Sequence, residues 1–240
     1  MLQDSRKNVS GKIFIQTTIH WVKSRYEKKY QLIVGMIFDI IFNYLIWIIA
    51  GYLIGDLVVG IFHWMKDTYF DPFTPILGGI FIWGSRLHHI RPGYVTEFDD
   101  YDLIMSSGKW TLLWMGPFMY YIDFSVFSIS LFLTIAANDM IHKYSHMTEK
   151  ERPEWTTILQ NMYVFQSVEE HHLHHTYPHD THYCPITPFW NNILEHNNFW
   201  KRLENFIELN TGMKPRQYQN EFVEDKRYPG GIKFIESSNA

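Results

Sequence analysis

The stretch LIVGMIFDIIFNYLIWIIAGYLIGDLVVGIFHW, residues 32–64, decides which kind of fold this chain can adopt. It runs for 33 residues with polar interruptions at Asp39, Asn43 and Asp56. A single transmembrane helix needs about 20 apolar residues, so the stretch is long for one span and short for two. Ala50-Gly51-Tyr52 near its middle is a candidate turn, and we expect a helical hairpin here.

A second apolar run covers residues 111–137. Gly116-Pro117 and the polar Asp123 interrupt it, which leaves halves of 12 and 14 residues. Each half is too short for an ordinary span, so we expect a second hairpin that is partly re-entrant or completed by flanking residues. The apolar segment 72–83 is also too short to span and is expected to lie at the membrane interface.

Nine of the thirteen histidines gather in four short clusters near these runs: His63; His88 and His89; His142 and His146; His171, His172, His174 and His175. Neutral imidazole offers a lone pair at physiological pH, which makes histidine the commonest metal ligand. On a helix, His142 and His146 share one face. His171, His174 and His175 also share a face, whereas His172 points about 100° away.

The other clustered residues suit two metal sites. Adjacent His88 and His89 diverge on a helix, so each can serve one of two neighbouring metals. His63 is followed one helical turn later by Asp67, whose carboxylate would bind a metal directly or orient a ligating imidazole.

A lone His-x-x-x-His pair is weak evidence, because helices contain such pairs by chance. Four clusters beside apolar runs favour metal binding. His20 and His196 have no histidine nearby and are interpreted as surface residues. His179 and His182 follow Pro178 in a polar loop and are interpreted as structural or substrate-facing, with His179 kept as a further candidate ligand.

The kind of metal follows from the ligand chemistry. A structural zinc site closes with four ligands that usually include cysteine, and this chain has one cysteine, Cys184. Soluble di-iron proteins use Glu and Glu-x-x-His pairs, of which this chain shows no paired signature. Two irons held mainly by histidine, with positions open to dioxygen, fit the ligands better.

The predicted topology follows from the clusters. If both apolar runs double back, all clusters face one compartment, and the basic segment before residue 32 marks it as cytosolic. We expect an all-α integral membrane protein with about four transmembrane or re-entrant helices in two hairpins and a cytosolic, helical, histidine-rich cap. Its parts are a cytosolic segment 1–30, a membrane domain 31–215 and a C-terminal tail 216–240, whose last dozen residues are expected to be loose.

Composition narrows the function classes. The 240 residues are 18% aromatic, which suits a broad membrane interface, and the mean hydropathy of −0.19 places much of the chain outside lipid. A net charge of −4 without a basic stripe argues against nucleic acid as a partner. The N-terminus resembles neither a cleaved signal nor a transit peptide, which favours the endoplasmic reticulum over a plastid in a eukaryotic host.

The residues from about 55 to 215 resemble the Kua-type lipid desaturases, which include plasmanylethanolamine desaturase and a plastid phosphatidylglycerol trans-desaturase. The markers, in order, are Asp56…Gly60-x-x-His63-Trp64-x-x-Asp67-Thr68, His88-His89-x-x-Pro92, Asn138-x-x-x-His142-Lys143-x-Ser145-His146, His171-x-x-His174-His175, Pro178-His179-x-Thr181-x-Tyr183-Cys184, Asn191, Phe199-Trp200-x-Arg202-Leu203-Glu204 and Thr211-Gly212-x-Lys214-Pro215.

This resemblance implies a membrane di-iron lipid desaturase that uses dioxygen and a separate cytochrome b5-like electron donor. The implied iron ligands are His63, His88, His89, His142, His146, His171, His174 and His175. Asp67 and Asn191 are implied as additional or water-mediated ligands. The first choice of reaction is vinyl-ether formation from a 1-O-alkyl phospholipid, as in plasmalogen biosynthesis, because 138–146 and 199–215 are closest to that branch.

The chain departs from that branch at 120–124, Glu170 and Pro188-Phe189, which leaves the histidine set intact and puts the substrate in doubt. Desaturation of an acyl chain on a glycerolipid or fatty acid is therefore the second choice, and hydroxylation on the same scaffold the third. A non-catalytic membrane zinc-binding protein is the alternative from another class. Histidines at or beyond the ends of the apolar runs argue against a transport pathway.

Overall fold

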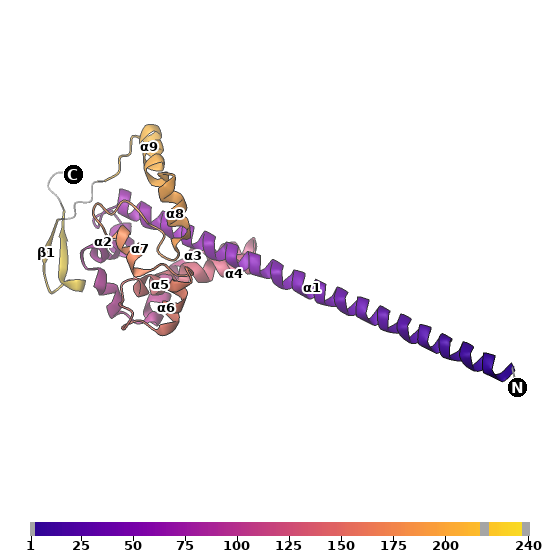
Figure 1. The fold of residues 1–240 in the computed structure, drawn as a ribbon. Helices are drawn as coiled ribbons and strands as arrows, with labels where there is room; N and C mark the ends of the chain where they lie inside the picture. The colour runs from indigo at the N-terminus through magenta and orange to yellow at the C-terminus, as the bar shows by residue number, and fades with distance from the viewer. Residues whose placement is uncertain (1–2, 217–220, 237–240) are drawn as a thin grey trace. The chain divides into compact units, whose positions relative to one another are not determined.

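The computed structural model describes residues 3–216 and 221–236, which are mostly helical (Figure 1). In chain order the elements are α1 (Gln3–Tyr69), the π-helix η1 (Gly78–Ile82), α2 (Trp83–Ile90), the 3-10 helix η2 (Pro92–Glu97), α3 (Asp100–Tyr121), α4 (Val126–Ala136), α5 (Asn138–Tyr144), α6 (Glu154–Asn161), α7 (Val168–His174), α8 (Pro188–His196), α9 (Phe199–Thr211), β1 (Glu221–Glu224), the 3-10 helix η3 (Pro229–Gly231) and β2 (Ile232–Ile235).

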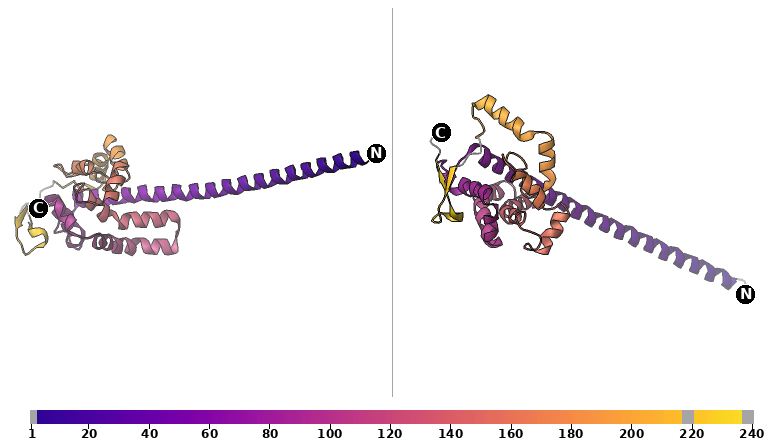
Figure 2. Two further views of the ribbon diagram at one scale, coloured as in Figure 1. Left: turned by 60° about the horizontal axis from the view of Figure 1, so that its bottom comes forward. Right: turned by 60° about the vertical axis from the view of Figure 1, so that its left-hand side comes forward.

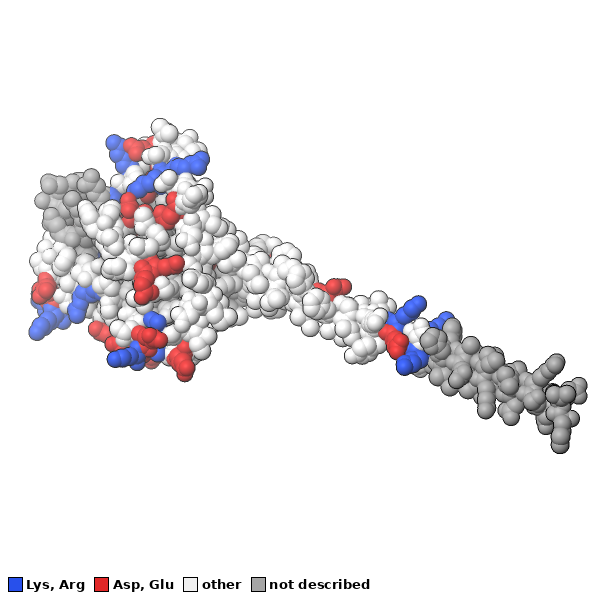
Figure 3. All heavy atoms as spheres, in the orientation of Figure 1, with Lys and Arg blue, Asp and Glu red and all other residues white. Residues whose placement is uncertain are grey.

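Helix α1 carries the first apolar run. The chain divides into residues 1–47 and residues 48–240, and α1 contributes to both units. Its segment Lys23–Tyr69 is the one helix among the described residues that is long and apolar enough to cross a membrane, and none of its most apolar 18-residue window is buried. Uncharged side chains dominate the surface of α1 in that region (Figure 3). A membrane span therefore fits this helix.

The expected first hairpin is wrong, because α1 continues through Ala50-Gly51-Tyr52 without a turn. Gly51 instead permits close packing on α4: a Cβ atom there would lie 2.6 Å from the carbonyl oxygen of Phe127 and 2.7 Å from Cβ of Ser130. Glycine is used in this way where membrane helices approach closely. The inference that placed the basic segment and the histidines in one compartment depended on this hairpin and loses its basis.

The second apolar run does double back, as expected. Helices α3 and α4 pack side by side as a hairpin (Figure 2). The chain turns between them over residues 122–125, where the Ser125 side chain caps α4 by accepting from the backbone N–H of Ser128. Flanking residues complete the first arm, since α3 begins at Asp100 and includes Pro117.

The segments between the hairpin and the C-terminus form short helices around a buried core. Segment 72–83 exposes Phe73, Ile76 and Ile80, and its location at a membrane interface stays a prediction. The largest buried cluster contains Trp64, Tyr183, Cys184, Leu194 and Trp200, and joins the end of α1 to helices α8 and α9.

The described part of the C-terminal tail contains a β-hairpin, which is not all-α, and residues 229–235 are ordered where a loose end was expected; residues 237–240 lie outside the described residues. Strands β1 and β2 pair antiparallel, with Phe222 opposite Phe234. Ile232 and Phe234 are buried against Leu87 of α2. Four residues per strand are too few for a clear period-2 pattern in the sequence, and burial on α2 stabilises them instead.

Candidate metal centre

Four separate parts of the chain bring the clustered histidines together. His63 lies near the end of α1, His88 and His89 in the last turn of α2, His142 and His146 in and just after α5, and His171, His174 and His175 in and just after α7. Their ligand atoms form two groups, and within each group all of these atoms lie within 4.8 Å of one another.

The first, which we call the five-histidine group, contains His88, His142, His146, His171 and His175. Nε2 of His171 lies 2.8 Å from Nε2 of His142 and 2.8 Å from Nε2 of His146. Nε2 of His175 lies 3.0 Å from Nε2 of His88 and 3.0 Å from Nε2 of His171. A neutral imidazole has a single N–H, so several nitrogens that face one another at these distances are best satisfied by a shared cation.

Gln166 sets the orientation of one of these imidazoles. Its buried side-chain oxygen accepts a hydrogen bond from Nδ1 of His171 at 3.1 Å, which leaves the lone pair on Nε2. The backbone carbonyl of Gln166 accepts from Ser145 at 3.2 Å and from Gln160 at 3.0 Å. Gln166 thus links α7 to the end of α5 and to α6, a role that no local sequence pattern indicated.

The second, which we call the Asp67 group, contains His63, Asp67, His89 and His174, all buried. Oδ2 of Asp67 lies 2.9 Å from Nε2 of His89, 3.3 Å from Nε2 of His63 and 3.6 Å from Nε2 of His174. Among the described residues, Nε2 of His174 has no hydrogen-bond partner although it is buried. The unpartnered Nε2 of His174 and the neighbouring carboxylate of Asp67 could both serve as ligands to one metal ion.

The loop over residues 181–187, which we call the buried loop, orients two imidazoles of this group. Nδ1 of His63 donates to the carbonyl oxygen of Tyr183 at 3.0 Å, and Nδ1 of His174 donates to that of Thr181 at 2.8 Å. Asp56 of α1 holds the end of the same loop, since its carboxylate accepts from the backbone N–H of Ile186 at 3.0 Å and from the Thr187 hydroxyl at 2.7 Å. In the sequence, Asp56 stands out as a carboxylate within an apolar run, which indicates that it has a specific partner.

Burial keeps the imidazoles of the five-histidine group neutral. Desolvation, followed by repulsion from neighbouring imidazoles, holds the pKa values of His88, His142 and His171 well below their usual range. The same causes lower the pKa of His146 to about 4 and that of His175 to about 2. At physiological pH these side chains carry lone pairs and no proton to displace, which favours metal binding.

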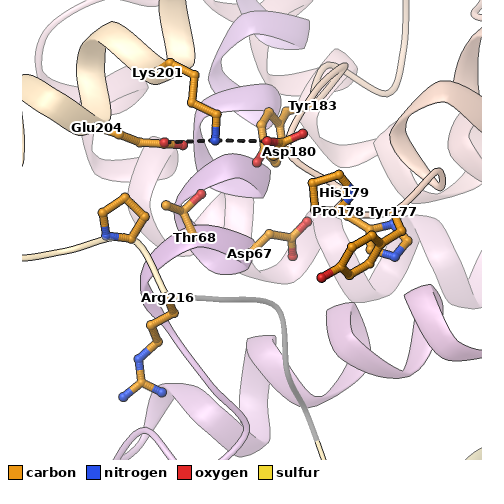
Figure 4. A pocket seen from close by; sticks show the side chains of 11 residues that line it. Asp67, Thr68, Tyr177, Pro178, His179, Asp180, Tyr183, Lys201, Glu204 and Arg216 are labelled. Atoms are coloured by element: carbon orange, nitrogen blue, oxygen red, sulfur yellow. Dashed lines mark hydrogen bonds and ion pairs between the residues drawn. The ribbon is translucent and has the colours of Figure 1, made fainter.

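A polar cavity of about 350 Å³ reaches the Asp67 group (Figure 4). Asp67, His179 and Tyr183 line its inner part, and Lys201 and Glu204 of α9 line another wall. The Lys201 ammonium pairs with Asp180 at 2.9 Å and with Glu204 at 3.2 Å. The cavity therefore carries charges of both signs beside a candidate metal site.

The remaining histidines whose side chains are described lie outside both groups. His172 is exposed on α7, as its helical position predicted, and His196 is exposed on α8. The side chain of His20 lies outside the described residues. His179 is half-buried, and its ring centroid lies 4.7 Å from that of His89, while Nδ1 donates to the carbonyl oxygen of His174 at 3.1 Å. The half-buried His182 donates its backbone N–H to Glu195.

The Asn191 side chain hydrogen-bonds to the backbone of Cys184. Its side-chain oxygen accepts from the backbone N–H of Cys184 at 3.0 Å, and its amide nitrogen donates to the carbonyl of the same residue at 2.8 Å. Both ends of the amide are therefore used to hold the buried loop. Cys184 is itself fully buried beside Gly60 and belongs to neither group.

A family model described as a lipid desaturase domain matches residues 52–218 of this chain. The chain belongs to the lipid desaturase family. The resemblance seen in the histidine motifs is thereby confirmed, and all eight of those histidines lie within the matched region of this lipid desaturase.

Individual relatives have two kinds of names. The chain is 56% identical over 189 residues to a probable fatty acid desaturase of Acanthamoeba polyphaga mimivirus, which covers 79% of the chain and 94% of that protein. It is 34% identical to plasmanylethanolamine desaturase 1 of Mus musculus, over 70% of the chain and 66% of that protein. It is 27% identical to the chloroplastic fatty acid desaturase 4 of Arabidopsis thaliana, over 70% of the chain and 53% of that protein. The chain thus spans less than two thirds of the mouse and plant relatives. No solved structure matches it.

The donor set of this lipid desaturase fits two metal ions. Imidazole nitrogens suit iron, copper or zinc, and one carboxylate distinguishes the Asp67 group from the five-histidine group. The division of His88 and His89 between the two groups is the arrangement expected for adjacent ligands to neighbouring metals.

Proposed function

We propose that this protein is an integral membrane di-iron desaturase that uses dioxygen to introduce a double bond into a lipid chain. The observation that carries the proposal is the convergence of the five-histidine group and the Asp67 group. The two groups adjoin, since the ring centroids of His89 and His175 lie 5.1 Å apart and those of His63 and His142 lie 6.3 Å apart. Two metals held there would act on one substrate.

The proposed ligands are the eight histidines of these groups together with Asp67. Two irons bound to them and reduced by an external, cytochrome b5-like donor would supply the oxidising power of dioxygen for removing hydrogen from an unactivated C–H bond. In the net reaction the lipid loses two hydrogens from neighbouring carbons, and dioxygen takes up these hydrogens, two electrons and two protons to form two waters. The neutral imidazoles leave the centre with a high positive charge, which Asp67 reduces at one metal only.

The surroundings support a lipid substrate in a membrane. Helix α3 exposes Leu112, Leu113, Trp114 and Phe118, and helix α4 exposes Leu133. Such exposed apolar surfaces suit contact with lipid chains. We propose a multi-pass location, in the endoplasmic reticulum membrane if the host is eukaryotic.

Vinyl-ether formation from a 1-O-alkyl phospholipid is the proposed reaction. It is supported by the similarity to the mouse plasmanylethanolamine desaturase. The reacting carbons of such a substrate lie next to the glycerol oxygen, so a polar headgroup must be accommodated near the metals. The cavity at Asp67, with Lys201, Asp180 and Glu204, offers polar groups at that place.

Desaturation of an acyl chain is the second candidate. The observation that favours it is the 56% identity to the mimivirus protein, whose name is that of a probable fatty acid desaturase. An acyl substrate would use the same two groups, because removal of hydrogen from neighbouring carbons is common to both reactions.

The test is lipid mass spectrometry on desaturase-null cells that express the chain and are fed a 1-O-alkyl glycerol, beside a His142→Ala/His146→Ala variant. An acid-labile vinyl-ether phospholipid that disappears in the variant supports the first candidate. A new acyl double bond without vinyl ether supports the second. No lipid change from a folded, zinc-loaded protein would overturn the desaturase proposal and favour a zinc-binding role.

A further inference from the structure

The C-terminal β-hairpin lies beyond the region that the lipid desaturase family model matches. That region ends at residue 218, whereas the hairpin begins at Glu221. The hairpin nevertheless packs on α2, the helix that carries His88 and His89 (Figure 1). An element outside the family domain therefore contacts a helix that takes part in both candidate metal sites.

The contact is close and apolar. Leu87, Ile232 and Phe234 are each at most 5% exposed and form one buried cluster with Trp83, Ile90 and Tyr94 at its edge. The rings of Trp83 and Phe234 meet edge to face, with centroids 5.8 Å apart. The chain also passes tightly over Leu87 at Gly230: a Cβ atom there would lie 2.9 Å from Cδ2 of Leu87.

Polar contacts fix α2 at two further points. The Arg91 guanidinium, one residue beyond α2, donates to the carbonyl oxygen of Gly230 in the hairpin. Arg86 donates to the carbonyl oxygens of Asp67 at 2.7 Å and Phe70 at 2.8 Å, which ties α2 to the end of α1. Helix α2 is thus held by α1 through Arg86 and by the hairpin through Leu87 and Arg91.

External support is needed because α2 has eight residues and is extended only by the five-residue π-helix η1 that precedes it. Isolated helices shorter than about 12–15 residues are marginal in water, so packing must stabilise α2. His88 contributes to the five-histidine group and His89 to the Asp67 group. A shift or fraying of this helix would therefore move one ligand of each site at once.

We propose that the hairpin over 221–235 is a positioning element of the metal centre, which holds α2 so that one imidazole reaches each group. This inference rests on the proposed metal binding but not on the identity of the lipid. Residues that support metal ligands without touching the metal typically contribute 10–100-fold in metal affinity.

The test compares two isoleucines of the same strand. Ile232→Ala removes a buried side chain, whereas Ile235→Ala removes the same atoms from a side chain that is 41% exposed. Full-length proteins are purified with iron, and iron release to a chelator is followed over time. We expect release from Ile232→Ala, and from Phe234→Ala, to be about 10-fold faster or more for both irons, with Ile235→Ala matching the wild type.

Further measurements separate the possible failures. Hydrogen exchange of the amides of α2 should be faster in Ile232→Ala than in Ile235→Ala, with exchange in α3 and α4 unchanged. If Ile232→Ala does not fold, Ile232→Val gives a milder form of the same test. Wild-type iron release and wild-type exchange in the buried variants would overturn the positioning role alone. A wild-type protein that binds no iron would overturn the proposed function, and the positioning role with it.

Discussion

Nε2 of His89 lies 2.9 Å from Oδ2 of Asp67, while the preceding residue, His88, places its Nε2 3.0 Å from Nε2 of His175. Two adjacent residues therefore enter groups of different charge. One group contains a carboxylate and the other only imidazoles. This asymmetry predicts that substitutions can remove one metal and leave the other.

Asp67→Asn preserves the shape of the side chain and removes its negative charge. We expect the iron content to fall from about two to about one per chain, because the Asp67 group loses its anionic ligand while the five-histidine group is intact. Desaturation should fall by about 10–100-fold or more. Iron is measured by plasma mass spectrometry, with Asp102→Asn on the exposed surface as the control; unchanged iron and activity in Asp67→Asn would contradict the assignment.

His171 and His172 provide a matched pair within α7. His171 is 1% exposed and faces the five-histidine group, whereas His172 is exposed. We expect His171→Ala to lose iron and desaturation, and His172→Ala to retain both. Equal losses in the two variants would show that the effect comes from disturbing α7 and not from removing a ligand.

Gly51 tests the packing of α1 on α4. Gly51→Leu would add a whole side chain at a position where even a Cβ atom would lie 2.6 Å from the carbonyl oxygen of Phe127. Overpacking of this kind costs about 1–3 kcal/mol, so the variant should unfold at a lower temperature in detergent. Gly35→Leu, where a Cβ atom meets nothing within 4 Å, is the control. A Gly51→Leu protein as stable as the control would contradict the close approach.

The metal-free protein should have a lower free energy of unfolding in mild acid than at neutral pH. The unfolded chain's histidines protonate near pH 6.5, whereas His146 in the folded protein has a pKa of about 4 and His142 and His171 lie well below 6.5. The unfolded state therefore binds more protons, and stability falls as the pH drops from 6.5 toward 4. Each histidine that stays neutral removes about 1.4 kcal/mol per pH unit in that range.

Thermal unfolding at pH 7.5 and pH 5.5, with chelator present, measures this effect. The melting temperature should be lower at pH 5.5. The difference should shrink in His142→Ala/His146→Ala, which lacks two of these imidazoles. Equal melting temperatures of the wild-type protein at the two pH values would be inconsistent with neutral buried histidines.

Part of this arrangement is visible in the sequence. The one-face spacing of His171, His174 and His175 and the isolation of His172 follow from helical geometry alone, and the polar break at Asp123 marks the turn of the second hairpin. Other features depend on contacts between distant residues. From the sequence alone Gly51 is predicted to be a turn residue, and its close packing on α4 is known only from the structure. Gln166 has no local sequence pattern that links it to His171. The strand 232–235 is too short to be distinguished from a loose tail without its burial on Leu87.

The most direct test of the central claim is the metal content of the purified protein and of one variant from each group. Cells are grown with iron, and iron and zinc per chain are counted for the wild type, Asp67→Asn and His142→Ala/His146→Ala. The account predicts about two irons in the wild type and about one in Asp67→Asn, with a loss of at least one iron in the histidine variant. A wild-type protein that holds zinc in place of iron, or a single metal per chain, would contradict the account.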